Sequence, residues 1–155
     1  MKRITLHNRQ RRHRIDRGTL QQLALQLLQQ HEARYRQLAD LTLEIMLMGD
    51  RGAAALNRAA LGHAGPTDVI ALRYAAIPGI EEAASADVML NVERAWQLGG
   101  GTIERADREL ALYLAHAIDH LAGHNDDTPA AARAMRRREW RWLSRTGVPA
   151  LFKRS

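Results

Sequence analysis

The sequence predicts an α+β protein in which helices and strands alternate in layers around one core. The chain has 155 residues, of which 46% are apolar, enough to bury a core of ordinary size. Short runs of apolar residues are interspersed with longer runs of helical period, and no internal repeat interrupts that order. We therefore expect a single domain over residues 1–155.

The first 40 residues are expected to form a strand and then a helix. Residues 4–6 alternate in polarity and precede Asn8, as at the end of a short strand. Asp16 is a suitable N-cap for a helix that extends to about Glu32. The leucines of this segment recur at helical spacing and form one apolar stripe: Leu20, Leu23, Leu27 and Leu28.

The middle of the chain is expected to add three strands and two short helices. Apolar runs bounded by turn residues predict strands at 41–48, 69–74 and 86–92. Helix-forming composition predicts a helix over 53–61, closed by Gly62, and another over 93–98. Three consecutive glycines then interrupt the chain.

Two longer helices complete the prediction of four strands and about five helices. One covers about residues 104–122, with Thr102 as its N-cap and Gly123 just beyond its last turn. The other begins at Thr128 and Pro129, residues that favour a helix start, and carries a run of arginines.

Positive charge is concentrated at the two ends of the chain. Residues 1–17 carry seven Lys or Arg and one acid, and residues 133–155 carry eight and one, whereas the body between them carries eight basic and fifteen acidic residues. This distribution predicts a basic face on an acidic body and favours a nucleic-acid partner over the alternative of a solvated surface. The candidate contacts are Arg11, Arg12, Arg14, Arg137, Arg138 and Arg141. Trp140 and Trp142 are candidates to stack on bases, but their spacing of two on a helix predicts that at least one belongs to the core.

Several classes of protein are excluded or disfavoured by composition. The chain has no cysteine, which excludes disulfides, thiolate nucleophiles and zinc sites built on Cys. It has no apolar run long enough to span a bilayer, and its first residues lack the pattern of a secretory signal. We therefore expect a cytoplasmic protein.

Three histidines within nine residues predict a metal site. His116 and His120 are four residues apart on the second-last helix, so both imidazoles project from one face. Gly123 lets the chain turn back, and Asp126 or His124, with Asp127 behind them, can then supply a third ligand. A pair of surface or core histidines is the alternative interpretation.

The motifs of this chain resemble those of the YbeY family of bacterial rRNA maturation endoribonucleases. Residues 116–126 (HAIDHLAGHND) resemble the family's H-G-x-L-H-L-x-G-Y-D-H, and residues 56–72 resemble its L-N-x-x-Y-R-G-x-D-x-P-T-D-V-L-S-F. Residues 86–95 are similar to G-D-I-x-I-S-x-E-x-A, and Met135 and Glu139 fall at family spacings. The resemblance covers residues 40–143 in the right order.

The resemblance implies a zincin-like fold, with a mixed, mostly parallel four-stranded sheet and the two-histidine helix beneath it. It also implies one Zn²⁺, held in the family by three His, and cleavage of single-stranded RNA by a zinc-bound water. The implied role is formation of the 3′ end of small-subunit rRNA and ribosome quality control. The implied partners are rRNA, the small ribosomal subunit and an Era-type GTPase.

This chain departs from the family pattern at positions that bear on chemistry. The third His is Asp126, the Arg of Y-R-G is Leu61, and the Ser of V-L-S-F is Ala71. Zinc accepts a carboxylate, so His116, His120 and Asp126 are the expected ligands. Arg58 and Arg73 can replace the lost Arg on spacing alone, with solvated surface arginines as the alternative. Asp119 replaces an apolar residue and is either a plain helix-surface acid, which we favour, or a base or support for the site.

Two other functions compete with the ribonuclease. The departures at Leu61 and Ala71 favour a non-catalytic ribosome-assembly factor that keeps the fold and the RNA surface. A metallohydrolase acting on peptides or small molecules is disfavoured, because Ala117 stands where zinc proteases carry the Glu that serves as base. The family's last helix is often acidic, whereas this one is rich in arginine.

Overall fold

The computed structural model of the chain describes residues 3–81 and 83–154 and confirms the predicted order of strands and helices. The strands are β1 (Ile4–Asn8), β2 (Thr42–Met48), β3 (Val69–Tyr74) and β4 (Ser85–Asn91). The helices are α1 (Arg17–His31), α2 (Asp50–Leu61), α3 (Val92–Leu98), α4 (Ile103–Leu121) and α5 (Pro129–Thr146). The sequence did not predict the short 3-10 helix at Arg36–Leu38, which leads from α1 to β2.

The four strands form one sheet in the order β1-β2-β4-β3. β1, β2 and β4 are parallel, and β3 joins the edge antiparallel to β4. The expected mixed, mostly parallel four-stranded sheet with five α-helices is therefore confirmed.

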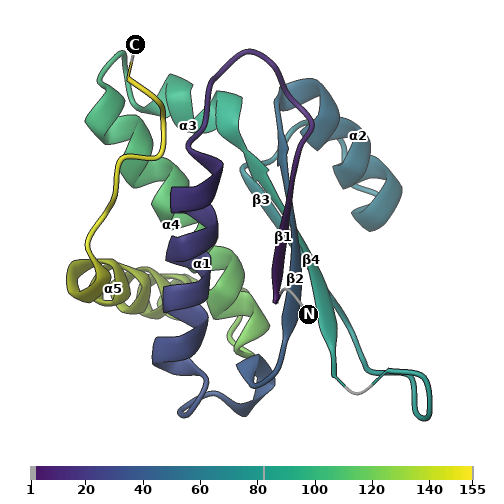
Figure 1. The fold of residues 1–155 in the computed structure, drawn as a ribbon. Helices are drawn as coiled ribbons and strands as arrows, with labels where there is room; N and C mark the ends of the chain where they lie inside the picture. The colour runs from purple at the N-terminus through teal and green to yellow at the C-terminus, as the bar shows by residue number, and fades with distance from the viewer. Residues whose placement is uncertain (1–2, 82, 155) are drawn as a thin grey trace.

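Helices cover both faces of the sheet, with α1 and α4 on one side and α2 on the other (Figure 1). The alternation in β2 supplies both layers, because successive strand residues point to opposite faces. Leu43, Ile45 and Leu47 are fully buried in the main core, whereas Met48 packs in a smaller cluster with Ala53 of α2. The core therefore packs α4 against the sheet, and this packing fixes the position of the histidines on α4.

Helix α4 lies at the centre of the fold, and twelve of its nineteen residues are buried. Its close approach to α3 requires glycine at position 99, since a Cβ there would lie 2.8 Å from the backbone nitrogen of Ala106. Thr102 is the N-cap residue as predicted, but its side chain makes no capping hydrogen bond, unlike Asp16 of α1 and Thr128 of α5.

The C-terminal segment returns to α4 and to the start of α1. The buried carboxylate of Asp107 accepts hydrogen bonds from the backbone of Leu151 and Phe152, at 2.9 and 2.8 Å, and from Arg154 at 2.8 Å. The backbone N–H of Lys153 donates to the carbonyl of Arg14. No helix in residues 3–81 or 83–154 is long and apolar enough to cross a membrane.

The two basic ends of the chain meet where the C-terminal segment joins the loop between β1 and α1. The loop between β1 and α1, with Arg11, Arg12 and Arg14, lies at the top of Figure 1, whereas α5 crosses the lower left. The C-terminal segment reaches that loop, whereas helix α5 lies apart from it (Figure 1). The structure thus carries the arginines of the loop and those of α5 on separate elements.

Candidate metal centre

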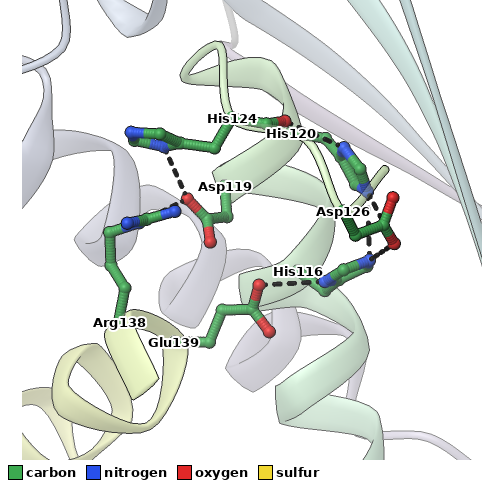
Figure 2. A network of polar contacts seen from close by, with 7 residues as sticks. All are labelled: His116, Asp119, His120, His124, Asp126, Arg138 and Glu139. Carbon is green, nitrogen blue, oxygen red and sulfur yellow. Dashed lines mark hydrogen bonds and ion pairs between the residues drawn. The ribbon is translucent and has the colours of Figure 1, made fainter. Parts of the chain in front are cut away.

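The last two turns of α4 present His116 and His120 on the same side, as their spacing of four predicts. Their Nε2 atoms lie 3.0 Å apart, and their side chains are 25% and 32% exposed. The rings meet nearly edge-on, with centroids 4.5 Å apart. Both imidazoles thus direct one nitrogen toward the same point at the protein surface (Figure 2).

The loop after α4 brings a carboxylate to the same point. Gly123 adopts a φ of 106°, which L side chains rarely adopt, and this turn reverses the chain. Asp126 then places its Oδ2 atom 3.7 Å from Nε2 of His116 and 3.8 Å from Nε2 of His120. The expected trio of His116, His120 and Asp126 is brought together, with one ligand atom from each within 4.8 Å of the others.

The three donor atoms fit a tetrahedral metal ion. Donors at zinc–ligand distances of 2.0–2.2 Å lie about 3.4 Å apart around a tetrahedral centre. The observed separations of 3.0, 3.7 and 3.8 Å bracket that value. Two imidazoles and one carboxylate are also a ligand set that zinc uses in catalytic sites, where a fourth position stays open.

The remaining nitrogen of each imidazole is held by an acceptor. Nδ1 of His120 donates to the backbone carbonyl of His124 at 3.1 Å, and Nδ1 of His116 lies 2.9 Å from the Glu139 carboxylate of α5. Because both acceptors favour a proton on Nδ1, the lone pair of each neutral ring is on Nε2. When both rings are neutral, two lone pairs and a carboxylate oxygen converge, an arrangement that a cation stabilises.

The charges around His116 and Glu139 alter their affinities for protons. Burial lowers the pKa of His116, but the hydrogen bond and charge of Glu139 outweigh it and raise that pKa above its ordinary value. Burial raises the pKa of Glu139 to about 6, and the Asp119 carboxylate acts in the same direction, while His116 opposes both. Without a metal, this pair therefore holds a proton more firmly than separate groups would.

Asp119 supports the site from behind, and our expectation that it is a helix-surface acid is wrong. Its side chain is fully buried, since the turn of α4 that carries it faces α5 and the loop rather than solvent. One carboxylate oxygen accepts hydrogen bonds from Nδ1 of His124 at 2.9 Å and from Nε of Arg138 at 2.7 Å (Figure 2). Asp119 therefore ties the metal-site loop and α5 to α4.

The same contacts involve two further residues that the sequence singled out. His124 turns away from the other histidines toward Asp119 and packs edge-on against Tyr35, so it is not part of the converging trio. Arg138 was expected to contact nucleic acid, but its side chain is 14% exposed and is engaged by Asp119. Asp127 is exposed, and its backbone N–H donates to the side-chain oxygen of Asn125.

A cleft of about 440 Å³ opens beside the three ligands. It is lined by Leu61, residues 67–71, Arg73, His116, His120, Leu121 and Asp126. Leu61 and Ala71, which replace the family's Arg and Ser, both face this cleft. Arg73 also lines it and donates to the carbonyl of Leu121 at 3.2 Å, whereas Arg58 is not among the lining residues.

Sequence reasoning assigned no role to two residues that the structure places at the site. Glu139 holds His116, and Asp68 lines the cleft and acts on His116 through its charge. Asp68 lies in the motif over residues 56–72, and Glu139 falls at a spacing typical of the family. These patterns mark both residues, but they do not indicate what either side chain contacts.

The other nucleic-acid candidates remain on the surface or enter the core. Arg11, Arg12 and Arg14 are exposed, and Arg12 lies 3.3 Å from Glu93. Arg137 and Arg141 are exposed on α5. Trp142 is buried and stacks on His31, whereas Trp140 is half-buried beneath Arg108, so one of the two tryptophans belongs to the core as expected.

Comparison with known proteins places this geometry in a family. The family model described as Endoribonuclease YbeY matches residues 5–147. A curated Endoribonuclease YbeY of Anaeromyxobacter sp. (strain Fw109-5) is 36% identical over 101 residues, which is 65% of this chain and 52% of that protein. The same-named protein of Chlorobium phaeobacteroides is 35% identical over 105 residues, 66% of this chain and 70% of its own length.

The matched region spans about half the length of the first curated relatives: in Anaeromyxobacter dehalogenans it is 36% identical over 100 residues, or 51% of that protein. A Thermotoga maritima protein solved in solution shares the fold at a TM-score of 0.53 and 16% identity, with 92% of this chain and 91% of that one aligned. This likeness supports the fold alone. The match over residues 5–147 shows that the chain belongs to the YbeY family.

Proposed function

We propose that the chain is a single-domain, metal-dependent endoribonuclease that hydrolyses phosphodiester bonds in single-stranded RNA. In this proposal His116, His120 and Asp126 hold one Zn²⁺ at the mouth of the cleft. The observation that carries it is the convergence of two Nε2 atoms and one carboxylate oxygen, each nitrogen backed by an acceptor at its Nδ1. The name shared by the curated relatives supports the same activity.

Each residue of the centre has a defined task in this scheme. Zinc bound there supplies a Lewis acid and lowers the pKa of a coordinated water toward neutrality. Glu139 and the carbonyl of His124 keep both rings oriented with Nε2 toward the ion. Arg73, exposed at the cleft wall, has further N–H donors for a phosphate oxygen beyond the one that contacts Leu121.

The ligand set has a chemical consequence. Asp126 carries a negative charge where the family pattern has a neutral imidazole, so the centre is less positive by one unit. A charged ligand donates more to the metal and reduces its power to acidify water. We therefore propose slower hydrolysis at neutral pH than a three-histidine centre in the same cleft would support.

The proposed biological role is formation of the 3′ end of small-subunit rRNA and ribosome quality control in the cytoplasm. The proposed partners are rRNA, the small ribosomal subunit and an Era-type GTPase. Family membership is the support for this role.

The test is cleavage of a single-stranded RNA by the wild-type chain loaded with Zn²⁺. The control is the double variant His116→Ala/His120→Ala, prepared identically, with zinc content measured in both proteins. We expect cleavage and one zinc per chain in the wild type and neither in the control. Equal residual cleavage in the two proteins would reject the proposed activity.

A non-catalytic RNA-binding assembly factor is the second candidate, and Leu61 and Ala71 are the observation that favours it. Both line the cleft, so the family's Arg and Ser are missing at the place where a phosphate would lie. Restoring them with Leu61→Arg and Ala71→Ser distinguishes the two candidates. If only the restored variant cleaves RNA, the natural chain is the binding factor.

A further inference from the structure

The outer face of α5 carries a stripe of exposed arginines that the metal centre does not use. Arg133, Arg136, Arg137, Trp140, Arg141 and Ser144 together line a shallow groove of about 560 Å³. Their spacing of three and four residues places them along one side of the helix. The lining of the groove combines four arginines with the aromatic side chain of Trp140.

The arginines on this face form no ion pair with an acid of the described residues. Glu139 is the single acidic residue of α5, and it is buried on the opposite side against His116. Of the ion pairs in the described part of the chain, one involves Arg138, and none involves Arg133, Arg136, Arg137, Arg141 or Arg145. A stripe of unpaired guanidinium groups fits a polyanion.

The stripe also contains an aromatic side chain, that of Trp140. Trp140 is half-buried, and the guanidinium of Arg108 from α4 lies over its ring, 5.0 Å from the centroid. A positive groove combined with an aromatic side chain and stacked arginine is the arrangement that proteins use for single-stranded nucleic acid. A duplex shields the faces of its bases, so this groove fits a single strand better.

The helix that carries the stripe also contacts the metal centre. Pro129, where α5 begins, is three residues after Asp126, so their Cα atoms are at most about 11 Å apart. Glu139 and Arg138, on the inner side of the same helix, contact His116 and Asp119. A strand bound along the outer face therefore lies on a helix whose position relative to the cleft is fixed.

We propose that the arginine stripe of α5, formed by Arg133, Arg136, Arg137 and Arg141 around Trp140, is a docking surface for single-stranded RNA. It holds the backbone on one side of α5 while the cleft receives the bond to be cut. This inference rests on the proposed function, since RNA is the substrate proposed there.

The test measures RNA binding separately from cleavage. The stripe variant changes Arg133, Arg136, Arg137 and Arg141 to Gln, and a matched control changes four exposed arginines elsewhere, Arg34, Arg36, Arg51 and Arg105, to Gln. Metal-free proteins are titrated into a labelled single-stranded RNA of 12 nucleotides and into the corresponding duplex, by fluorescence anisotropy at several salt concentrations. Thermal melts followed by circular dichroism verify that both variants fold.

We expect the stripe variant to bind the single strand at least tenfold more weakly than the control at 100 mM salt. The slope of log K against log salt concentration should be shallower for the stripe variant than for the wild type by about 2.8. Each lost phosphate contact on a single strand removes about 0.7 from this slope, and the variant loses four arginines. Equal losses in the two variants would overturn the inference, as would duplex binding as tight as that of the single strand.

The same samples distinguish this inference from the proposed function. If the zinc-loaded wild type cleaves RNA but the stripe variant binds like the control, the function stands and the docking surface is wrong. If binding depends on the stripe but the wild type does not cleave, the docking surface stands and the nuclease proposal fails.

Discussion

Replacing Arg138 by Met tests how strongly the buried pair behind the metal centre stabilises the fold. Methionine keeps most of the stem of the side chain and removes the guanidinium, which lies 2.7 Å from Asp119. The Asp119 side chain is fully buried, and its second oxygen, Oδ2, has no hydrogen-bond partner among the described residues. The substitution therefore leaves a buried carboxylate supported by His124 alone.

The structure sets the size of the expected loss. Removing one partner of a buried ion pair typically lowers the free energy of unfolding by about 3–5 kcal/mol. We expect about 3 kcal/mol at pH 7, equivalent to a decrease in Tm of roughly 6–12 °C.

Urea unfolding of metal-free protein, followed by circular dichroism, measures this loss. Arg137→Met is the matched control, since the neighbouring Arg137 is exposed and forms none of the ion pairs of the described residues; its effect should stay within about 0.5 kcal/mol. The double variant Asp119→Leu/Arg138→Met removes both charges and should be more stable than Arg138→Met alone. A loss at Arg138 no larger than at Arg137 would refute the stabilising role of the buried pair.

Three further predictions concern the metal centre. Asp126→Ala should weaken zinc binding at least 100-fold in a chelator competition, while Asp127→Ala should not change it. The reason is that the loop directs only the first of these carboxylates at the histidines. Equal zinc affinities of the two variants would remove Asp126 from the site. In metal-free protein the raised pKa values of Glu139 and His116 mean that the folded state binds protons more tightly than the unfolded state. The free energy of unfolding should therefore fall as the pH rises from about 5 to 8, by roughly 1–2 kcal/mol from Glu139. The variant Glu139→Gln should flatten this pH dependence, and an unchanged profile would contradict the raised pKa of Glu139. Gly123→Ala should destabilise the protein by about 1–2 kcal/mol, since alanine is strained at a φ of 106° and its Cβ would lie 3.2 Å from Gln37. The same substitution should weaken zinc binding, because it displaces the loop that carries Asp126. An unaltered zinc affinity would show that the turn does not position Asp126.

The parts of the site that could be predicted are those determined by local spacing. His116 and His120 share a face because a helix repeats every 3.6 residues, and Gly123 marks a reversal because glycine is the residue that adopts positive φ without strain. The order of strands and helices follows from apolar patterns of similarly short range. These rules need no knowledge of what packs against each element.

The contacts that support the ligands depend on packing between distant segments and could not be predicted in the same way. Glu139 holds a histidine 23 residues earlier, a contact set by how α5 crosses α4. Arg137 and Arg138 are indistinguishable by composition, yet one is exposed and the other is largely covered and paired with Asp119. A charge run therefore identifies a basic segment but not which of its members face solvent.

The departures of this chain from the family pattern form a connected set. Asp119 stands at an apolar position of the family, and a lone acid buried there would be costly. Its two partners are His124, which stands at the Tyr position of the motif that this chain resembles, and Arg138 of α5. Because these residues lie on α4, on the loop and on α5, they connect the three segments that build the centre. The loop that presents Asp126 in place of the third histidine is thus held by an ion pair and a hydrogen bond of this chain's own, which is why the exchange of ligand and the change in its support should be tested together.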